Sequence, residues 1–215
     1  MDTFSQQVPF LRRLSDDAVA DIHFATLEIL ERTGLRLYDE EAVALLKKAG
    51  AHVSEGNLVR IPSHLVEWAI RTAPKRIPMF DRNGHQAMAL QGNNAYYGPG
   101  SDCPFILDHR SGARRQPDLS DIVDGMRLSD YLPNIDFVMS MFIPSDVPVP
   151  VSDRYQMEAM LLNTTKPIVY VTHALDGCKD AVEMAEVVAG GAEALRASPI
   201  ACCYINITAP LRHNQ

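Results

Sequence analysis

The stretches KPIVYVTHA, at residues 166–174, and PIACCYINI, at residues 199–207, are two mostly apolar segments with one helical pattern between them. That pattern repeats small apolar residues such as Ala181 and Ala185 at the spacing of one helix face. A strand that is apolar along its whole length, followed by a helix and a second such strand, is typical of a parallel sheet covered by helices. These two stretches therefore predict an α/β fold.

The same alternation continues toward the N-terminus. Its segments are the extended AYYGPG at 95–100, the helical DLSDIVDGMRLSDYL at 118–132, the apolar NIDFVMSMFIP at 134–144 and the helical SDRYQMEAMLLNTT at 152–165. In the last of these helices we expect Tyr155, Ala159 and Leu162 on the buried side. The chain from residue 95 onward thus predicts the order βαβαβαβ.

Four parallel strands are half of a (β/α)8 barrel, which takes about 250 residues. We therefore expect residues 95–215 to form the first half of such a TIM-type barrel, truncated after its fourth strand. An open dinucleotide-binding sheet is the alternative, but GPGSDCP at 98–104 lacks the third glycine of that fingerprint. A half-barrel leaves an unpaired sheet edge and an uncovered apolar face, so a homo-oligomer is expected.

Residues 1–94 have a different pattern, in which helices alternate with short extended pieces. A helix is expected to begin at Ser15 and a second one at Asp39, because both residues are good N-caps. Glu-Gly-Asn at 55–57 predicts a hairpin turn, and a third helix is expected to begin with Ser63 as its cap. Residues 1–94 are therefore predicted to form a small α+β extension.

The composition excludes several classes of protein. The net charge is −7, and no cluster of Lys and Arg extends beyond short pairs, so nucleic-acid binding is not expected. The N-terminus lacks the layout of a signal peptide and no apolar run approaches a membrane span, so we expect a cytoplasmic protein without membrane association. The four cysteines lack CxxC spacing, which predicts small buried apolar side chains and no metal site.

Four loops follow the predicted strands, and in parallel α/β folds the functional loops lie at the carboxyl ends of the strands. Their side chains are aromatic, hydroxyl-rich and mildly acidic, with neither a nucleophile elbow nor a phosphate-binding loop. An aromatic face beside a carboxylate is what a quaternary ammonium group requires, because that cation has no N–H to donate. The candidate side chains are Tyr96, Tyr97, Ser101, Asp102, Ser140, Met141, Asp146, Thr172, His173, Asn206 and Thr208.

Each of these residues also has a purely structural interpretation. Tyr96 and Tyr97 point in opposite directions along a strand, so at most one of them faces a site. Asp102 is of a type that also forms turns, and a single histidine such as His173 is often a satisfied structural group. The Gly-Pro-Gly corner at 98–100 is expected to leave room for a ligand or for a neighbouring loop.

Three motifs, YYGPGS, NIDFV and NTTKP, occur in this order along the chain. Together with the stretches around them they resemble the trimethylamine:corrinoid methyltransferase family, whose members include glycine betaine and other quaternary-amine methyltransferases that lack pyrrolysine. The resemblance covers essentially the whole chain. It implies a (β/α)8 barrel with an N-terminal extension, of which this chain covers the N-terminal half. The pyrrolysine position of the trimethylamine enzymes falls in the other half.

The resemblance implies that a methyl group moves from a tertiary or quaternary amine to the cob(I)alamin of a separate corrinoid protein. Cob(I)alamin is a strong nucleophile and a quaternary ammonium leaves as a neutral amine, so the protein mainly has to position the reactants and exclude water. The implied substrate-binding residues are Tyr97, Gly98, Gly100, Ser101, Ser140 and Asn206, and the implied catalytic residues are Asp102, as an electrostatic partner, and His173, as a polar orienting group. The alternatives are another small-molecule enzyme on a parallel α/β scaffold and a non-catalytic half-barrel assembly module.

Overall fold

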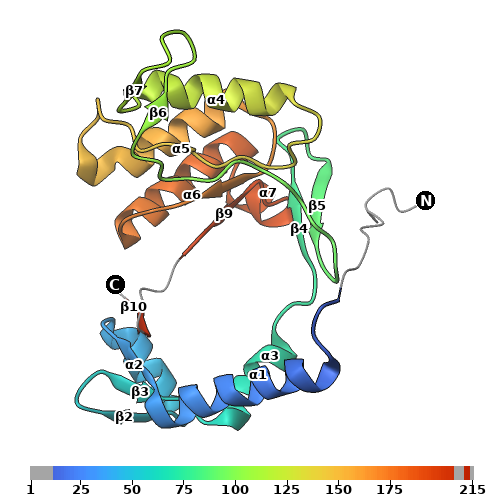
Figure 1. Cartoon of the computed structure of the whole chain (residues 1–215), viewed down its shortest axis with the longest axis vertical. Coiled ribbons are helices and arrows are strands. Elements are labelled where there is room, and N and C mark those ends of the chain that lie inside the picture. Colours follow the sequence, from blue (N-terminus) through green and yellow to red (C-terminus); the bar gives the residue numbers. More distant parts are fainter. Residues whose placement is uncertain (1–11, 206–210, 214–215) are drawn as a thin grey trace. The chain divides into compact units, whose positions relative to one another are not determined.

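The computed structural model describes residues 12–205 and 211–213, and the chain is a mixed α/β protein (Figure 1). Residue contacts divide the described residues into two units. We call residues 12–75 with 211–213 the small unit and residues 76–205 the large unit. The division falls between Lys75 and Arg76, so the hairpin that begins at Ile77 belongs to the large unit.

Helix caps predicted from the sequence open the first two helices of the small unit. Helix α1 (Asp16–Glu28) begins at Ser15, whose hydroxyl accepts a hydrogen bond from Ala18 N at 3.2 Å. It runs into a π-helical turn (Ile29–Thr33), which the sequence did not predict. Helix α2 (Glu40–Lys48) begins at Asp39, whose carboxylate accepts from Ala42 N at 2.7 Å. Both predicted N-caps are therefore confirmed.

Helix α3 (Ser63–Thr72) begins differently from the prediction. Its N-cap is Pro62, and no side chain caps it. Ser63 is the first helical residue, and its hydroxyl donates to the Glu31 carboxylate in the π-helical turn. The prediction of Ser63 as a cap was wrong because a tertiary partner, Glu31, takes the hydroxyl.

The sheet of the small unit has the strand order β10-β1-β3-β2. Its strands are β1 (Leu35–Leu37), β2 (His52–Ser54), β3 (Leu58–Arg60) and β10 (Arg212–His213). Strands β2 and β3 are antiparallel, and Glu55 and Gly56 in the turn between them have φ of 52° and 80°, so the hairpin is confirmed. Strand β10 pairs with β1 in parallel. Leu37, Ala51 and Val59 form the buried core of this unit.

The large unit opens with two antiparallel hairpins and then alternates between helices and short strands. Its elements are β4 (Ile77–Phe80), β5 (Gln86–Leu90), β6 (Ile106–Leu107), β7 (Arg114–Arg115), α4 (Leu119–Tyr131), a 3-10 turn (Val149–Val151), α5 (Ser152–Asn163), β8 (Ile168–Tyr170), α6 (Leu175–Ala189), α7 (Ala192–Ala197) and β9 (Ala201–Cys203). Within the described ranges, no helix is long and apolar enough to cross a membrane.

Parallel pairing links the predicted strands of the large unit. Strands β8 and β9 form a parallel pair, and Val138 makes a parallel bridge to Ile168 at the start of β8. The Asp136 amide donates to the Tyr97 carbonyl at 2.7 Å, which places residues 95–100 next to 134–144. Residues 95–100 are not a regular strand, because Pro99 has no N–H and interrupts any ladder.

Three helices of the large unit, α4, α5 and α6, pack around one buried cluster (Figure 1). The buried face of α5 differs from the prediction, since Tyr155 and Leu162 are exposed and only Ala159 is buried. The buried face of α5 begins with polar residues, so the spacing of apolar residues alone does not predict it. Its buried residues are Ser152, Asp153, Gln156, Met157, Ala159, Met160 and Leu161.

Candidate functional site

The candidate site lies in the large unit, where loops follow the parallel segments. We call residues 97–103, 140–143 and 172–174 the strand-end loops. The Met141 amide donates to the Gly100 carbonyl at 3.1 Å, and the Cys103 amide donates to the Met141 carbonyl at 3.1 Å. A parallel bridge between Cys103 and Phe142 continues this pairing. The first two strand-end loops are therefore joined side by side through their backbones.

Two residues in these paired loops have left-handed backbone conformations. Asp102 has φ of 63° and Met141 has φ of 65°. Aspartate tolerates this region, whereas methionine rarely adopts it, so the Met141 conformation is held by its surroundings. The Asp102 carboxylate also accepts a hydrogen bond from the Ser101 hydroxyl at 3.2 Å. Strained residues of this kind cluster at functional sites, and this favours the strand-end loops as the site.

Tyr97, which opens the first strand-end loop, and Tyr96 just before it have different environments. The Tyr96 hydroxyl accepts from the Ala89 amide at 2.8 Å, so Tyr96 ties the loop to strand β5. Tyr97 is 65% exposed, and its amide donates to the Asp136 carboxylate at 2.7 Å. One tyrosine is thus structural, and the other has a fixed backbone and an accessible ring.

The two glycines of the corner are not equivalent. A Cβ at Gly98 would lie 2.5 Å from the Phe137 carbonyl oxygen and 2.8 Å from the Phe137 ring. No described atom lies within 4 Å of a Cβ at Gly100. Neither glycine has a positive φ. The corner therefore leaves room for a neighbouring segment at Gly98, whereas Gly100 has open space beside it.

Ser140 belongs to the second strand-end loop, whose backbone is paired with the first, and His173 belongs to the third. Ser140 is buried, whereas His173 is exposed. The His173 amide donates to the Asp153 carboxylate at 3.3 Å, and no hydrogen bond within the described chain joins His173 to residues 97–103. Asn206 and Thr208 lie outside the described residues.

Asp153, which lies at the start of α5, was not among the residues predicted from the sequence. Its side chain is only 3% exposed and touches the third strand-end loop. Burial opposes ionisation of Asp153, but hydrogen bonds from Thr172 and His173 and the charge of Arg154 together lower its pKa. An aspartate at a helix start looks like an ordinary N-terminal charge, so the sequence carries no local signal for this contact.

The NTTKP motif is structural. The Lys166 ammonium donates to the carbonyl oxygens of Ser129 and Leu132 at the end of α4, each at 2.6 Å. The Thr164 hydroxyl donates to the Asp130 carboxylate at 2.8 Å. Burial lowers the pKa of Lys166 despite the nearby charge of Asp130. The motif thus fastens the end of α5 to the end of α4.

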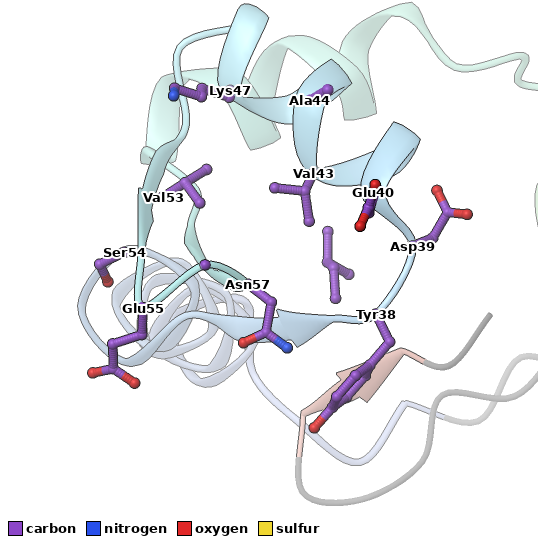
Figure 2. Close-up of a pocket in the computed structure, with 12 residues that line it drawn as sticks. Tyr38, Asp39, Glu40, Val43, Ala44, Lys47, Val53, Ser54, Glu55 and Asn57 are labelled. Carbon is purple, nitrogen blue, oxygen red and sulfur yellow. The ribbon is translucent and has the colours of Figure 1, made fainter.

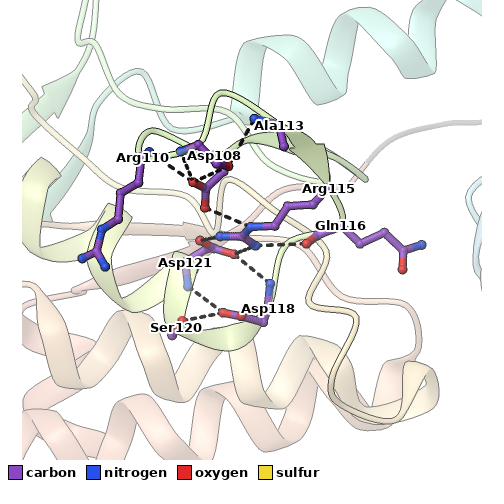
Figure 3. A network of polar contacts seen from close by, with 9 residues as sticks. Asp108, Arg110, Ala113, Arg115, Gln116, Asp118, Ser120 and Asp121 are labelled. Atoms are coloured by element: carbon purple, nitrogen blue, oxygen red, sulfur yellow. Dashed lines mark hydrogen bonds and ion pairs between the residues drawn. The ribbon is translucent and has the colours of Figure 1, made fainter.

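A polar network around Arg115 fastens the β6–β7 hairpin to the start of α4 (Figure 3). The Arg115 guanidinium donates twice to Asp121, at 2.7 Å each, and once to Asp108 at 3.1 Å. These bonds from Arg115 lower the pKa of Asp121 against the opposing effect of burial. Asp146, a candidate in the sequence, accepts from Leu119 N at 2.9 Å in the first turn of α4, whose N-cap is Asp118. These carboxylates have structural partners.

The small unit contains a cavity of about 660 Å³ between α2 and the β2–β3 turn (Figure 2). Val43 and Val53 point toward each other across it, and charged residues such as Glu40, Lys47 and Glu55 lie around its rim. None of the residues that line this cavity was predicted as a site residue, because the cavity lies in the N-terminal extension rather than at a strand end.

The four cysteines are free and differ in their exposure. Cys103 is exposed, and the other three are half-buried, so the prediction of burial was wrong for Cys103. Burial raises the pKa of Cys202, and burial together with neighbouring Cys178 raises the pKa of Cys203 to about 11. Among the residues that the structure describes, no group of three His, Cys, Asp or Glu side chains is arranged to hold a metal ion.

Comparison with known proteins gives one consistent result. Residues 1–215 match the family model described as trimethylamine methyltransferase. The chain is 31% identical over 208 residues to a trimethylamine methyltransferase of Desulfitobacterium hafniense, covering 94% of this chain and 41% of that protein. It is 27% identical over 211 residues to a glycine betaine methyltransferase of the same species, covering 98% and 44%. The chain therefore spans less than half the length of these curated relatives. With its whole length matched by the family model, the chain belongs to the trimethylamine methyltransferase family.

Proposed function

We propose that the protein containing this chain transfers a methyl group from a tertiary or quaternary amine to the cob(I)alamin of a separate corrinoid protein. The observation that carries the proposal is the exposed Tyr97 ring in the same loop as the Asp102 carboxylate. The relatives support it, since one is named as a trimethylamine and one as a glycine betaine methyltransferase. An amine with several methyl groups is their common chemistry.

The proposed architecture is the first half of a (β/α)8 barrel over residues 95–215, preceded by an α+β extension over residues 1–94. The parallel pairing of β8 with β9 and the parallel bridge from Val138 to Ile168 support it. The helices between these segments pack on one shared core, as the outer helices of such a barrel do. The relatives, of which this chain spans 41% to 44%, have room for a second half.

Tyr97 is the proposed contact for the methylated ammonium group. An ammonium without N–H groups is held by the face of an aromatic ring and by a nearby negative charge. Asp102, in the same loop, supplies that charge in the proposed site, and Gly98 lets the loop lie against Phe137. Ser101, Gly100, Ser140, His173 and Asn206 complete the proposed site.

The proposed reaction makes modest demands on the protein. Cob(I)alamin on the corrinoid protein would supply the electron pair of a new cobalt–carbon bond, while the C–N bond breaks and its electron pair stays on the nitrogen. A quaternary ammonium thereby releases a neutral tertiary amine without a proton, whereas a tertiary amine has to be protonated before it can leave as a neutral amine. What remains for the strand-end loops is to align nitrogen, carbon and cobalt and to keep water out, and alignment of this kind supplies a large part of many rate enhancements.

We expect residues 1–215 alone to be inactive, so methyl transfer is tested with the whole protein that contains this chain. It is mixed with reduced cobalamin and a panel of methylated amines while the loss of cob(I)alamin absorbance is followed. We expect at least one tertiary or quaternary amine to react. Tyr97→Ala should weaken amine binding by about 0.5–2 kcal/mol, or about 2- to 30-fold, because the cation–π contact is lost. Tyr131→Ala is the control, since Tyr131 is an exposed tyrosine on α4.

Folded protein that reacts with no amine, although the cobalamin is verified as reduced, would exclude the methyltransferase proposal. Equal loss of binding in both tyrosine variants would leave the reaction in place and remove Tyr97 as the contact.

A further inference from the structure

We infer that Asp153 is a positioning residue that fixes the backbone of His173 at the carboxyl end of β8. Its Oδ2 atom accepts a hydrogen bond from the His173 amide at 3.3 Å. The same oxygen lies 3.0 Å from the Thr172 hydroxyl, whose single proton it shares with the Ala174 carbonyl oxygen at 2.8 Å. Asp153 stands in the first turn of α5, so one carboxylate links that helix to the loop that follows β8. The meaning of this link for amine turnover rests on the proposed function, whereas the link itself does not.

The second carboxylate oxygen is also fully engaged. Oδ1 accepts from the Arg154 amide at 3.0 Å and from the Arg154 guanidinium at 3.2 Å. Arg154 in turn donates to the Asp180 carboxylate on α6 at 2.7 Å. A buried carboxylate is stable only when such partners satisfy it. Asp153 is therefore held from two sides and forms a rigid support for the loop.

Gly177 provides the space that this arrangement needs. It lies buried in the first turn of α6, where a Cβ would be 2.2 Å from Asp153 Oδ2 and 2.6 Å from Thr172 Oγ1. Glycine destabilises a helix relative to alanine, and Gly177 has no positive φ that would require it. The space that the Asp153 carboxylate occupies accounts for a glycine at this position.

The loop combines a fixed backbone with an accessible side chain. The His173 amide is bound to a buried carboxylate, while the residue itself is exposed. This combination presents a side chain at a defined place, which is what a binding or catalytic group at a strand end requires. An exposed loop histidine without such support would sample many positions.

The test uses protein labelled with [¹⁵N]histidine, in which the His173 amide is followed by NMR. Asp153→Asn keeps the shape of the side chain and removes its charge. The new side-chain NH2 group then faces a group that now donates a hydrogen bond to Asp153, so that hydrogen bond is lost. We expect the His173 amide signal to shift upfield and its hydrogen exchange to become about tenfold faster or more. Gly177→Ala should give the same two changes. Asp176→Asn is the matched control, because Asp176 is an exposed carboxylate at the same junction, and it should change neither.

Unchanged shift and exchange at His173 in both Asp153→Asn and Gly177→Ala, with the proteins folded, would overturn the inference. If Asp153→Asn does not fold, Thr172→Val removes one hydrogen bond and leaves the carboxylate, and it should still speed exchange at His173. Methyl transfer gives the second measurement, in which Asp153→Asn should lower kcat more than it raises KM. If the wild type is inactive but the His173 amide changes in the variants, the proposed function alone is rejected. If the His173 amide changes in Asp153→Asn while kcat stays at the wild-type value, the positioning role is rejected.

Discussion

Truncating Met157 to alanine is expected to destabilise the large unit by about 2–5 kcal/mol. Met157 is fully buried on α5, in the cluster that also contains Ile122, Met126 and Val138, so its loss leaves a cavity that the neighbours cannot fill. Leu162→Ala on the same helix removes a side chain of similar size that is 68% exposed. We expect that change to stay within about 0.5 kcal/mol.

Hydrogen exchange in α5 during urea denaturation measures the effect on the large unit. The single tryptophan, Trp68, lies in α3 of the small unit, so its fluorescence separately reports that unit and serves as the internal control. A larger loss from Leu162→Ala than from Met157→Ala would mean that α5 buries the face predicted from apolar spacing instead of the face described here.

Valine at position 98 is expected to destabilise the large unit by about 1–3 kcal/mol, because it is an overpacking substitution against a backbone atom. The new Cβ would lie 2.5 Å from the Phe137 carbonyl oxygen, which cannot move without shifting the segment that carries Asp136 and Val138. Gly98→Val should also weaken amine binding, because the same loop carries Tyr97. Gly100→Val is the control, because the described structure has open space at that position.

The stabilities of the two variants are compared by urea denaturation, with unfolding measured by amide hydrogen exchange in residues 134–144. Similar stabilities for Gly98→Val and Gly100→Val would show that the loop does not lie against Phe137.

Much of the fold could be predicted because its signals are local. Ser15 and Asp39 cap helices through their own side chains, and Glu55 and Gly56 turn the chain with conformations that suit a hairpin. The parallel pair β8–β9 follows from strands that are apolar throughout. Ser63 and the buried face of α5 could not be predicted, because a partner distant in sequence decides each of them.

The candidate site likewise has some features that local sequence signals predict and others that depend on distant partners. The rule that loops after parallel strands carry function nominated Tyr97, Asp102 and His173 as candidates, but it could not tell which side chains are accessible. Two of the motifs that carried the family resemblance have structural roles, since Lys166 fastens α4 and Asp136 holds the Tyr97 amide. Asp153 escaped notice because only the folded chain brings a helix start next to a distant loop. Family motifs in this chain therefore indicate architecture more strongly than chemistry.

The position of a bound methylated ammonium group decides where this protein acts. A crystal structure of the protein with glycine betaine should place the trimethylammonium group within about 6 Å of the centre of the Tyr97 ring, on the side of Asp102. Binding of that group in the small-unit cavity, beside Glu40 and Glu55, with the strand-end loops empty, would contradict the proposed site.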